Sequence, residues 1–263
     1  MNVCMMSSGR EKLALIEGTS EPSIVEALKD IAPDLAGFAI SFVYGEIYTR
    51  EGLSVEDRQI VTVAALAAMG GLESQLKFHI AGALNVGYTP SQLVELMTHL
   101  VVYAGFPAAL NGVSAVREVF RNKGIVAVPT SLAEPPESRF KAGLSALNEI
   151  DGAVGTRVID SLSDISPDLG RFIVEFAFGE IYTRPGLNLF LRELATVAAL
   201  AAMGSAMPQL KVHMHGFLNV GGSREQLVET IIQVAAYAGF PRAINAALVA
   251  RDVLADRDAG RHH

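Results

Sequence analysis

Apolar residues recur along this chain with helical spacing. The segments 58–69 and 192–203 are apolar on nearly all sides, which is typical of buried helices, and a glycine follows each of them. No segment alternates apolar and polar residues for long enough to predict a sheet, and 124–129 is the one short candidate for a strand. The pattern predicts an all-α fold.

Polar residues and glycines mark where these helices begin and end. Ser54 and Asn188 have side chains that cap helix N-termini, and each stands shortly before a predicted buried helix. The Gly-Phe-Pro sequences at 105–107 and 239–241 predict the end of one helix and the start of the next.

The chain also contains an internal duplication. Residues 31–111 align without a gap with residues 165–245, and more than half of the aligned pairs are identical. The identities gather in four blocks, at 45–50, 62–70, 75–79 and 103–107, and in their counterparts 134 positions later. These blocks retain polar residues, glycine and proline, whereas helical periodicity alone would constrain only the apolar positions.

The duplication predicts two tandem helical domains. We expect the first repeat at 10–123 and the second at 138–258, joined by a linker at 124–137 that contains three prolines. Within these ranges a helical lead-in, at 10–31 and at 138–165, precedes each duplicated segment, and the lead-ins share less sequence than the duplicated segments do.

Composition limits the kinds of partner that the chain can have. Half of the residues are hydrophobic and the mean hydropathy is +0.33, so we expect apolar surface to be buried between subunits of a homo-oligomer; an alanine-rich helical core is the alternative. A formal net charge of −7 argues against nucleic acid as a partner. Apolar runs are too short for a membrane helix, the start of the chain lacks a signal-peptide pattern, and the single cysteine, Cys4, allows no internal disulfide. These features predict a cytoplasmic protein.

Two histidines are the first candidates for chemistry. His79 and His213 each follow a glutamine by four residues, so each Gln and His share one helix face. Imidazole is suited to proton transfer near neutral pH. The alternative is a buried histidine whose hydrogen bonds are satisfied within the core.

Arginines retained in both copies are candidates for binding an acidic substrate. They are Arg50 and Arg58 in the first copy, and Arg184 and Arg192 in the second. A guanidinium group matches the two oxygens of a carboxylate. The alternative is an ion pair on one helix face with Glu46 or Glu180, each four residues before an arginine.

One position breaks the symmetry of the candidate residues. Glu193 in the second copy corresponds to Gln59 in the first, and an amide cannot take up a proton. We therefore predict one competent type of site per chain, built around second-half residues. Tyr237 and its counterpart Tyr103 could donate hydrogen bonds from a pocket wall, or be satisfied core tyrosines.

Metal binding is weakly supported. His213 and His215 are two residues apart, so their rings face away from each other on a helix, and the first copy has alanine in place of His215. We predict neither a metal nor a cofactor, because the chain also lacks a glycine-rich phosphate loop.

The conserved blocks resemble the carboxymuconolactone decarboxylase family, whose relatives include alkylhydroperoxidase D-type proteins. The resemblance rests on the runs 181–200, 209–221 and 237–245 and on their first-half counterparts. It implies an all-α, alkylhydroperoxidase D-like fold in each repeat. Single-domain members form trimers or hexamers, so a tandem chain is expected to form a trimer.

The resemblance also separates two chemistries. The peroxidase branch has a Cys-x-x-Cys-x-x-x-His motif, but the cysteine positions here are Leu72 and Gln75 in the first copy, and Ala206 and Gln209 in the second. Disulfide exchange requires two thiols, and Cys4 cannot replace them, so a peroxidase is disfavoured.

The decarboxylase branch requires no cofactor. Its reaction implies loss of a carboxylate from a butenolide lactone, followed by protonation of a dienolate on carbon. By this resemblance Arg184 and Arg192 would orient the substrate carboxylates, and Tyr237 or His215 would stabilise charge on the lactone oxygen.

The remaining role is that of the proton donor, which the resemblance gives to His213, tuned by Glu193. We thus expect a lyase acting on a small carboxylated lactone or related acid in aromatic-compound catabolism. A non-catalytic protein that binds small molecules in the same pocket is the alternative.

Overall fold

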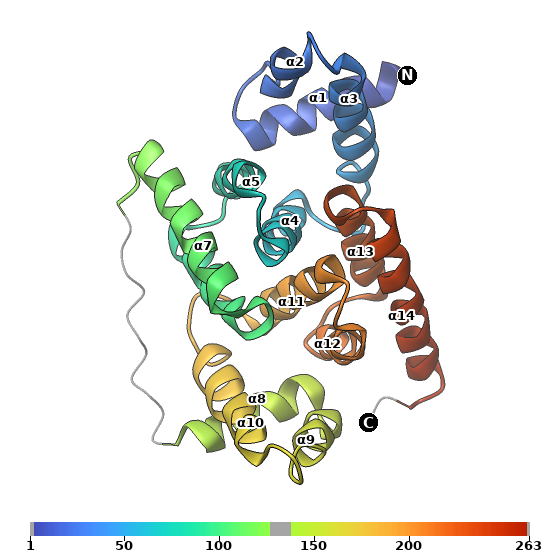
Figure 1. The fold of residues 1–263 in the computed structure, drawn as a ribbon. Coiled ribbons are helices and arrows are strands. Elements are labelled where there is room, and N and C mark those ends of the chain that lie inside the picture. Colours follow the sequence, from blue (N-terminus) through green and yellow to red (C-terminus); the bar gives the residue numbers. More distant parts are fainter. Residues whose placement is uncertain (1–2, 127–137, 262–263) are drawn as a thin grey trace.

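A computed structural model describes residues 3–126 and 138–261, and these residues form helices and no strand (Figure 1). The prediction of an all-α fold is confirmed. The linker expected at 124–137 falls largely on 127–137, outside the described residues.

The helices come in two equivalent sets. The first comprises α1 (Val3–Glu17), α2 (Ser23–Leu28), α3 (Pro33–Phe38), the π-helix η1 (Ala39–Ile47), α4 (Val55–Met69), α5 (Glu73–Asn85), α6 (Pro90–His99) and α7 (Val101–Asn122). The second comprises α8 (Arg139–Asp151), α9 (Ala153–Asp160), α10 (Pro167–Phe172), the π-helix η2 (Ile173–Ile181), α11 (Leu189–Met203), α12 (Met207–Asn219), α13 (Arg224–Ala238) and α14 (Phe240–Asp258).

The predicted helix boundaries are found in the structure. The Ser54 side chain accepts a hydrogen bond from Asp57 N (3.1 Å), and Asn188 accepts one from Leu191 N (2.9 Å). The expected break at Gly-Phe-Pro falls at Gly105, where φ is 81° and α7 bends. Its counterpart Gly239, with φ 86°, ends α13.

Helices α4 and α11 form the centre of the molecule and pack along each other more extensively than any other pair of elements. Every residue of 58–67 and of 192–202 is buried. Most of these residues are small and apolar, which lets the two helices approach closely. Both halves therefore contribute to one shared hydrophobic core.

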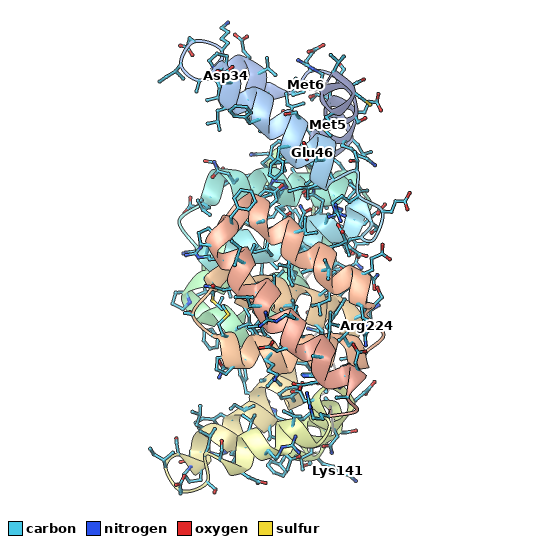
Figure 2. All side chains as sticks on the ribbon, turned by 90° about the vertical axis from the view of Figure 1, so that its right-hand side faces the viewer. Met5, Met6, Asp34, Glu46, Lys141 and Arg224 are labelled. Carbon is cyan, nitrogen blue, oxygen red and sulfur yellow. The ribbon has the colours of Figure 1, made fainter. Side chains whose placement is uncertain are left out.

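The lead-in helices lie at opposite ends of the molecule. Figure 2 shows Met5, Met6 and Asp34 at one end and Lys141 at the other, with α13 and α14 between them. Helix α8 packs against η2, and a Cβ at Gly179 would lie 2.2 Å from the Arg139 carbonyl oxygen. Only glycine allows α8 and η2 to cross this closely.

The π-helices were not predicted from the sequence. Each ends with an i→i−5 backbone hydrogen bond, from Tyr48 N to Val43 O and from Tyr182 N to Ala177 O (both 3.0 Å). Such helices are uncommon and occur often at functional sites. Here they place Tyr48 and Tyr182 over the central helices.

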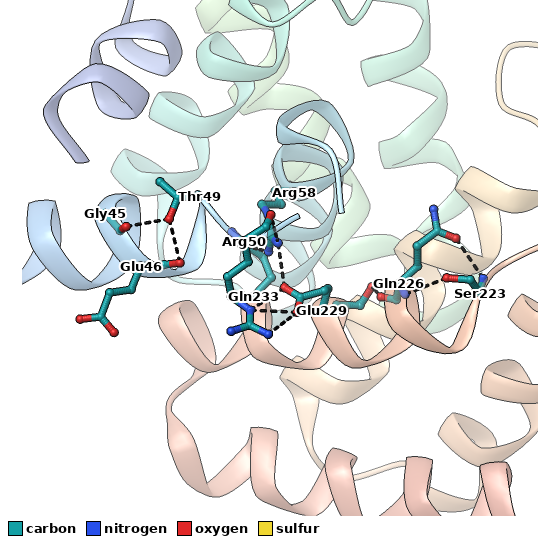
Figure 3. A network of polar contacts seen from close by, with 10 residues as sticks. Gly45, Glu46, Thr49, Arg50, Arg58, Ser223, Gln226, Glu229 and Gln233 are labelled. Carbon is teal, nitrogen blue, oxygen red and sulfur yellow. Dashed lines mark hydrogen bonds and ion pairs between the residues drawn. The ribbon is translucent and has the colours of Figure 1, made fainter. Parts of the chain in front are cut away.

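Ion pairs join each half to the other. In Figure 3 the Arg50 and Arg58 side chains meet the Glu229 carboxylate, and Glu46 points away from them. Arg50 Nη2 lies 2.6 Å from Glu229 Oε1, and Arg58 Nη2 lies 2.8 Å from Oε2. Gln233 accepts a further hydrogen bond from Arg58 Nη1 (3.2 Å).

The second half repeats this arrangement with Glu95 of the first half. Arg184 Nε and Arg192 Nη2 each lie 3.0 Å from Glu95 Oε1. The alternative of an ion pair with the glutamate four residues earlier is not found: Arg50 pairs with Glu229 and Arg184 with Glu95, while Glu180 pairs with Arg139. Two cations share each buried carboxylate, which compensates its burial better than a single pair would.

We expect Glu95→Gln to lower the free energy of unfolding by about 3–5 kcal/mol, because two arginines at a buried site would lose their counter-charge. Urea denaturation measures the change. The control is Glu118→Gln, which removes a partly exposed pair with Lys77 and should have little effect. Equal losses in the two variants would contradict the structural importance of Glu95.

Candidate functional site

His213 and Glu193 form the centre of the candidate site. His213 lies on α12 and Glu193 on α11, and both side chains are buried. His213 Nδ1 lies 2.9 Å from Glu193 Oε2. Because Nδ1 is engaged, Nε2 is the ring nitrogen left to face a ligand.

Two tyrosines extend this pair. Tyr182 donates a hydrogen bond to Glu193 Oε1 (2.5 Å), and its hydroxyl also contacts that of Tyr103. Since the Tyr182 proton goes to Glu193, Tyr103 is the donor to Tyr182. Tyr103 comes from the first half, so residues of both halves build this site.

A second carboxyl group, that of Asp151, lies beside the pair. Asp151 ends α8, is buried, and has one carboxyl oxygen, Oδ1, without a hydrogen-bond partner. A Cβ at Gly216 would lie 2.9 Å from Glu193 Oε2 and 3.1 Å from Asp151 Oδ1. Both carboxyl groups therefore lie against the same side of Gly216, where a larger residue would carry its side chain.

The protonation of these groups follows from their surroundings. Burial disfavours the charged form of His213, but the Glu193 carboxylate and its hydrogen bond, with Asp151, outweigh burial and raise the pKa of His213 to about 9. Burial raises the pKa of Asp151 to about 7, against the opposing effect of His213. At neutral pH His213 is a cation, and Asp151 is near its titration point.

These groups open onto a cavity of about 290 Å³. Its polar lining residues are Tyr103, Asp151, Gln209 and His213. The other lining side chains are apolar and include Phe178. Such a cavity suits a small ligand with a mainly apolar body.

A neutral histidine supports the site from behind. Arg192 Nη1 donates to His99 Nδ1 (3.4 Å), and His99 Nε2 donates to Thr196 Oγ1 (2.8 Å). Thr196 in turn donates to the Arg192 carbonyl (2.9 Å). Burial and the Arg192 charge hold the pKa of His99 well below its usual value, so it stays neutral.

The first half has the same geometry without the charge. His79 Nδ1 lies 3.0 Å from Gln59 Oε1, and Gln59 Nε2 donates to Tyr48 Oη (3.1 Å). Tyr48 contacts Tyr237, which the second half contributes. Burial lowers the pKa of His79 to about 3, because an amide supplies no counter-charge. His79 is therefore neutral where His213 is charged.

The first-half site also differs in having larger side chains and in the orientation of the Glu17 carboxylate. Tyr44 and Phe78 stand where the second half has Phe178 and Val212. The Phe78 ring packs 5.1 Å from that of His79. Glu17, the counterpart of Asp151, accepts a hydrogen bond from Ser23 N instead of facing the histidine.

The structure separates some of the predicted site residues. Arg184 and Arg192 are held by Glu95, as Arg50 and Arg58 are by Glu229, and none of the four lines the cavity. Tyr237 lies beside His79 rather than His213. His215 does not line the cavity either, in keeping with its place on the opposite side of α12.

Sequence reasoning missed Asp151, Tyr182 and His99 as members of this site, and gave Tyr103 no place beside His213. A signal for Asp151 was present, because Glu17 and Asp151 are acidic residues 134 positions apart in the lead-ins. Within the described parts of the chain, no group of three or more His, Cys, Asp or Glu side chains is arranged to hold a metal ion. The same residues contain no helix long and apolar enough to cross a membrane.

Comparisons with known proteins agree with this architecture. The model of the carboxymuconolactone decarboxylase family matches residues 33–118 and 167–252. A 4-carboxymuconolactone decarboxylase of Acinetobacter baylyi is 36% identical over 121 residues, 46% of this chain and 90% of that protein. A nitrosuccinic acid decarboxylase of Metarhizium robertsii is 31% identical over 86 residues, 33% of this chain and 59% of that protein.

One solved structure supports the fold over nearly the whole chain. It is a candidate gamma-carboxymuconolactone decarboxylase subunit from Burkholderia xenovorans, with a TM-score of 0.61. The similarity covers 95% of this chain and 98% of that one at 24% identity, so it bears on the fold alone.

The charge on His213 makes stability depend on pH. The pKa of His213 in the folded protein lies above the usual 6.5. The stabilisation that charged His213 gives the folded state is therefore complete below pH 6.5 and is lost as the pH rises through about 9. We expect the free energy of unfolding of the wild type to fall over this range, and Glu193→Gln to remove most of the slope.

Urea denaturation at a series of pH values above 7 measures this slope. His79→Gln is the matched control and should keep it, because the pKa of His79 is lowered and that residue is already neutral there. An unchanged slope in Glu193→Gln would contradict the charged state of the His213 pair.

Proposed function

The chain belongs to the carboxymuconolactone decarboxylase family, and on this basis we propose that it is a cofactor-independent decarboxylase of a small carboxylated lactone or related acid. Relatives named as decarboxylases of two different acids support a decarboxylase-like role. We place the reaction in the breakdown of aromatic compounds.

The observation that carries this proposal is the charged His213–Glu193 pair at an apolar cavity. Decarboxylation leaves an electron pair on carbon, so the site must supply a proton and disfavour water. A histidine that is protonated at neutral pH can supply the proton, and an apolar cavity favours the spreading of charge as carbon dioxide forms.

The steps balance without a cofactor. The bond between the substrate carbon and its carboxylate breaks, carbon dioxide leaves, and the electron pair is delocalised into a dienolate through the ring double bond. His213 Nε2 donates a proton to carbon, and solvent restores that proton. Glu193 orients the ring and stabilises the imidazolium, while Tyr182 and Tyr103 hold Glu193 in place.

A thiol peroxidase remains disfavoured. The position one turn before His213 is Gln209, the corresponding first-half residue is Gln75, and Cys4 is exposed on α1. Peroxide reduction through a dithiol would require cysteines at these positions.

We expect His213→Gln to lower decarboxylation by about 100-fold or more, the usual contribution of a general acid. His79→Gln is the matched control and should retain activity. Release of carbon dioxide from a panel of carboxylated butenolides, which includes 4-carboxymuconolactone, is the measurement. Ligand binding without release of carbon dioxide from any member would instead favour a binding protein.

The difference between the halves is tested by exchanging their polar groups. Glu193→Gln should reduce turnover as His213→Gln does, because the imidazole would become neutral like that of His79. Gln59→Glu should leave turnover close to that of the wild type, since Tyr44 and Phe78 crowd the first-half site. Equal effects of the two exchanges would contradict a single competent type of site.

We also propose that the chain forms a homo-oligomer, a trimer of tandem chains. Equivalent apolar side chains are exposed in both halves, namely Phe106 (59%) and Phe240 (61%), and Leu110 (63%) and Ile244 (57%). Light scattering after gel filtration should give a trimer, and Phe106→Ser with Phe240→Ser should shift it towards the monomer. A monomeric wild type would contradict the proposal.

A further inference from the structure

The cavity beside His213 has an unusual balance of charge for a site that binds acids. None of the described residues that line it is arginine or lysine. The nearby cations Arg184 and Arg192 share the Glu95 carboxylate, so they are not available to a ligand. His213 is thus the one cationic group that the described lining offers.

Two carboxyl groups already face that single cation. Glu193 binds His213 Nδ1 directly, and Asp151 lies beside Glu193 against Gly216, with Oδ1 unpartnered. Asp151 is 7% exposed and lines the cavity. A ligand carboxylate that enters the cavity therefore meets the His213 imidazolium, which Glu193 already pairs, and the Asp151 carboxyl group, which has no counter-charge.

The other lining side chains determine how polar and how large the rest of the ligand can be. Val102, Leu147, Ile159, Ile173 and Val212 surround the remaining space. These side chains offer no hydrogen bond to a second ionised group, and Gln209, which also lines the cavity, has a neutral amide and supplies no counter-charge. Burying an ionised group without a counter-charge is costly. A cavity of about 290 Å³ is small for a ligand site and suits a compact molecule.

We propose that this cavity selects a small acid with one carboxylate and an otherwise apolar body, and that Asp151 excludes a second carboxylate. The single carboxylate pairs with His213, and the apolar body lies against the aliphatic wall. A second carboxylate would lie near Asp151 with no cation to balance it. This inference rests on the proposed function for the identity of the site, and it narrows the substrate class to monocarboxylates.

Binding of two matched probes tests the selection without any turnover. Furan-2-carboxylate and furan-2,5-dicarboxylate share one ring and differ by one carboxylate. Titration calorimetry at pH 8, where Asp151 is mostly ionised, should show the monocarboxylate binding at least about tenfold more tightly, as one uncompensated charge requires. Equal affinity, or preference for the dicarboxylate, in the wild-type protein would overturn the proposal.

Asp151→Asn tests the residue responsible. This substitution keeps the shape of the side chain and removes its charge, so the preference should fall at least about threefold, mainly through tighter binding of the dicarboxylate, while the part that the apolar lining imposes should remain. Glu17→Gln, at the equivalent first-half position, should leave the preference unchanged. An unchanged preference in Asp151→Asn would overturn the role of Asp151.

Turnover separates this inference from the proposed function. If furan-2-carboxylate binds selectively but no acid in the panel of butenolides releases carbon dioxide, the decarboxylase proposal fails and the ligand class stands. If 4-carboxymuconolactone, which has two carboxylates, is decarboxylated with a higher kcat/KM than its monocarboxylate analogues, the decarboxylase stands and the selection is wrong.

Discussion

The structure depends on two buried carboxylates that each hold a pair of arginines from the opposite half. Glu95 and Glu229 tie the helices α6 and α13 to the loops and central helices of the other repeat. Tyr103 follows α6 at the start of α7, and Tyr237 lies in the last turn of α13, so the same crossing carries each tyrosine into the opposite site. Because the carboxylates are buried, the loss of one would leave two arginines without a counter-charge, so separating the halves costs free energy. The two halves therefore share one hydrophobic core and build two interlocked sites.

The two sites differ in charge because Gln59 of the first half corresponds to Glu193 of the second. Gln59 and Glu193 hold the same hydrogen bonds to histidine and tyrosine, yet one histidine is neutral and the other is a cation. Behind them, Gln233 replaces His99 and makes the same contacts to arginine and threonine. An amide reproduces the directions of a neutral imidazole, which explains why the fold tolerates the exchange. The shared core thus gives the two sites the same hydrogen-bond geometry, while the residue at position 59 or 193 sets the charge of the neighbouring histidine.

Local interactions explain why the helices and their ends were predictable and the partners were not. Caps such as Ser54 and breaks such as Gly105 act within a few residues, so the sequence contains the whole interaction. The arginines had a plausible local partner four residues away, and the actual partner lies far along the chain in the other repeat. Periodicity carries no information on such distant pairs. The π-helices were also missed, and in the structure η1 packs closely against α1 and η2 against α8.

The sequence by itself determined the helical class, the duplication and the family resemblance, and it singled out the two histidines with Glu193 and Gln59 as candidate site residues. These follow from short-range periodicity and from comparing one half with the other. Only the tertiary structure decided that Tyr103 rather than Tyr237 reaches His213 and that Asp151 belongs to the site. It also decided that the arginines form ion pairs with Glu95 and Glu229. Each of these depends on which helices cross, and crossing is settled by packing over the whole core.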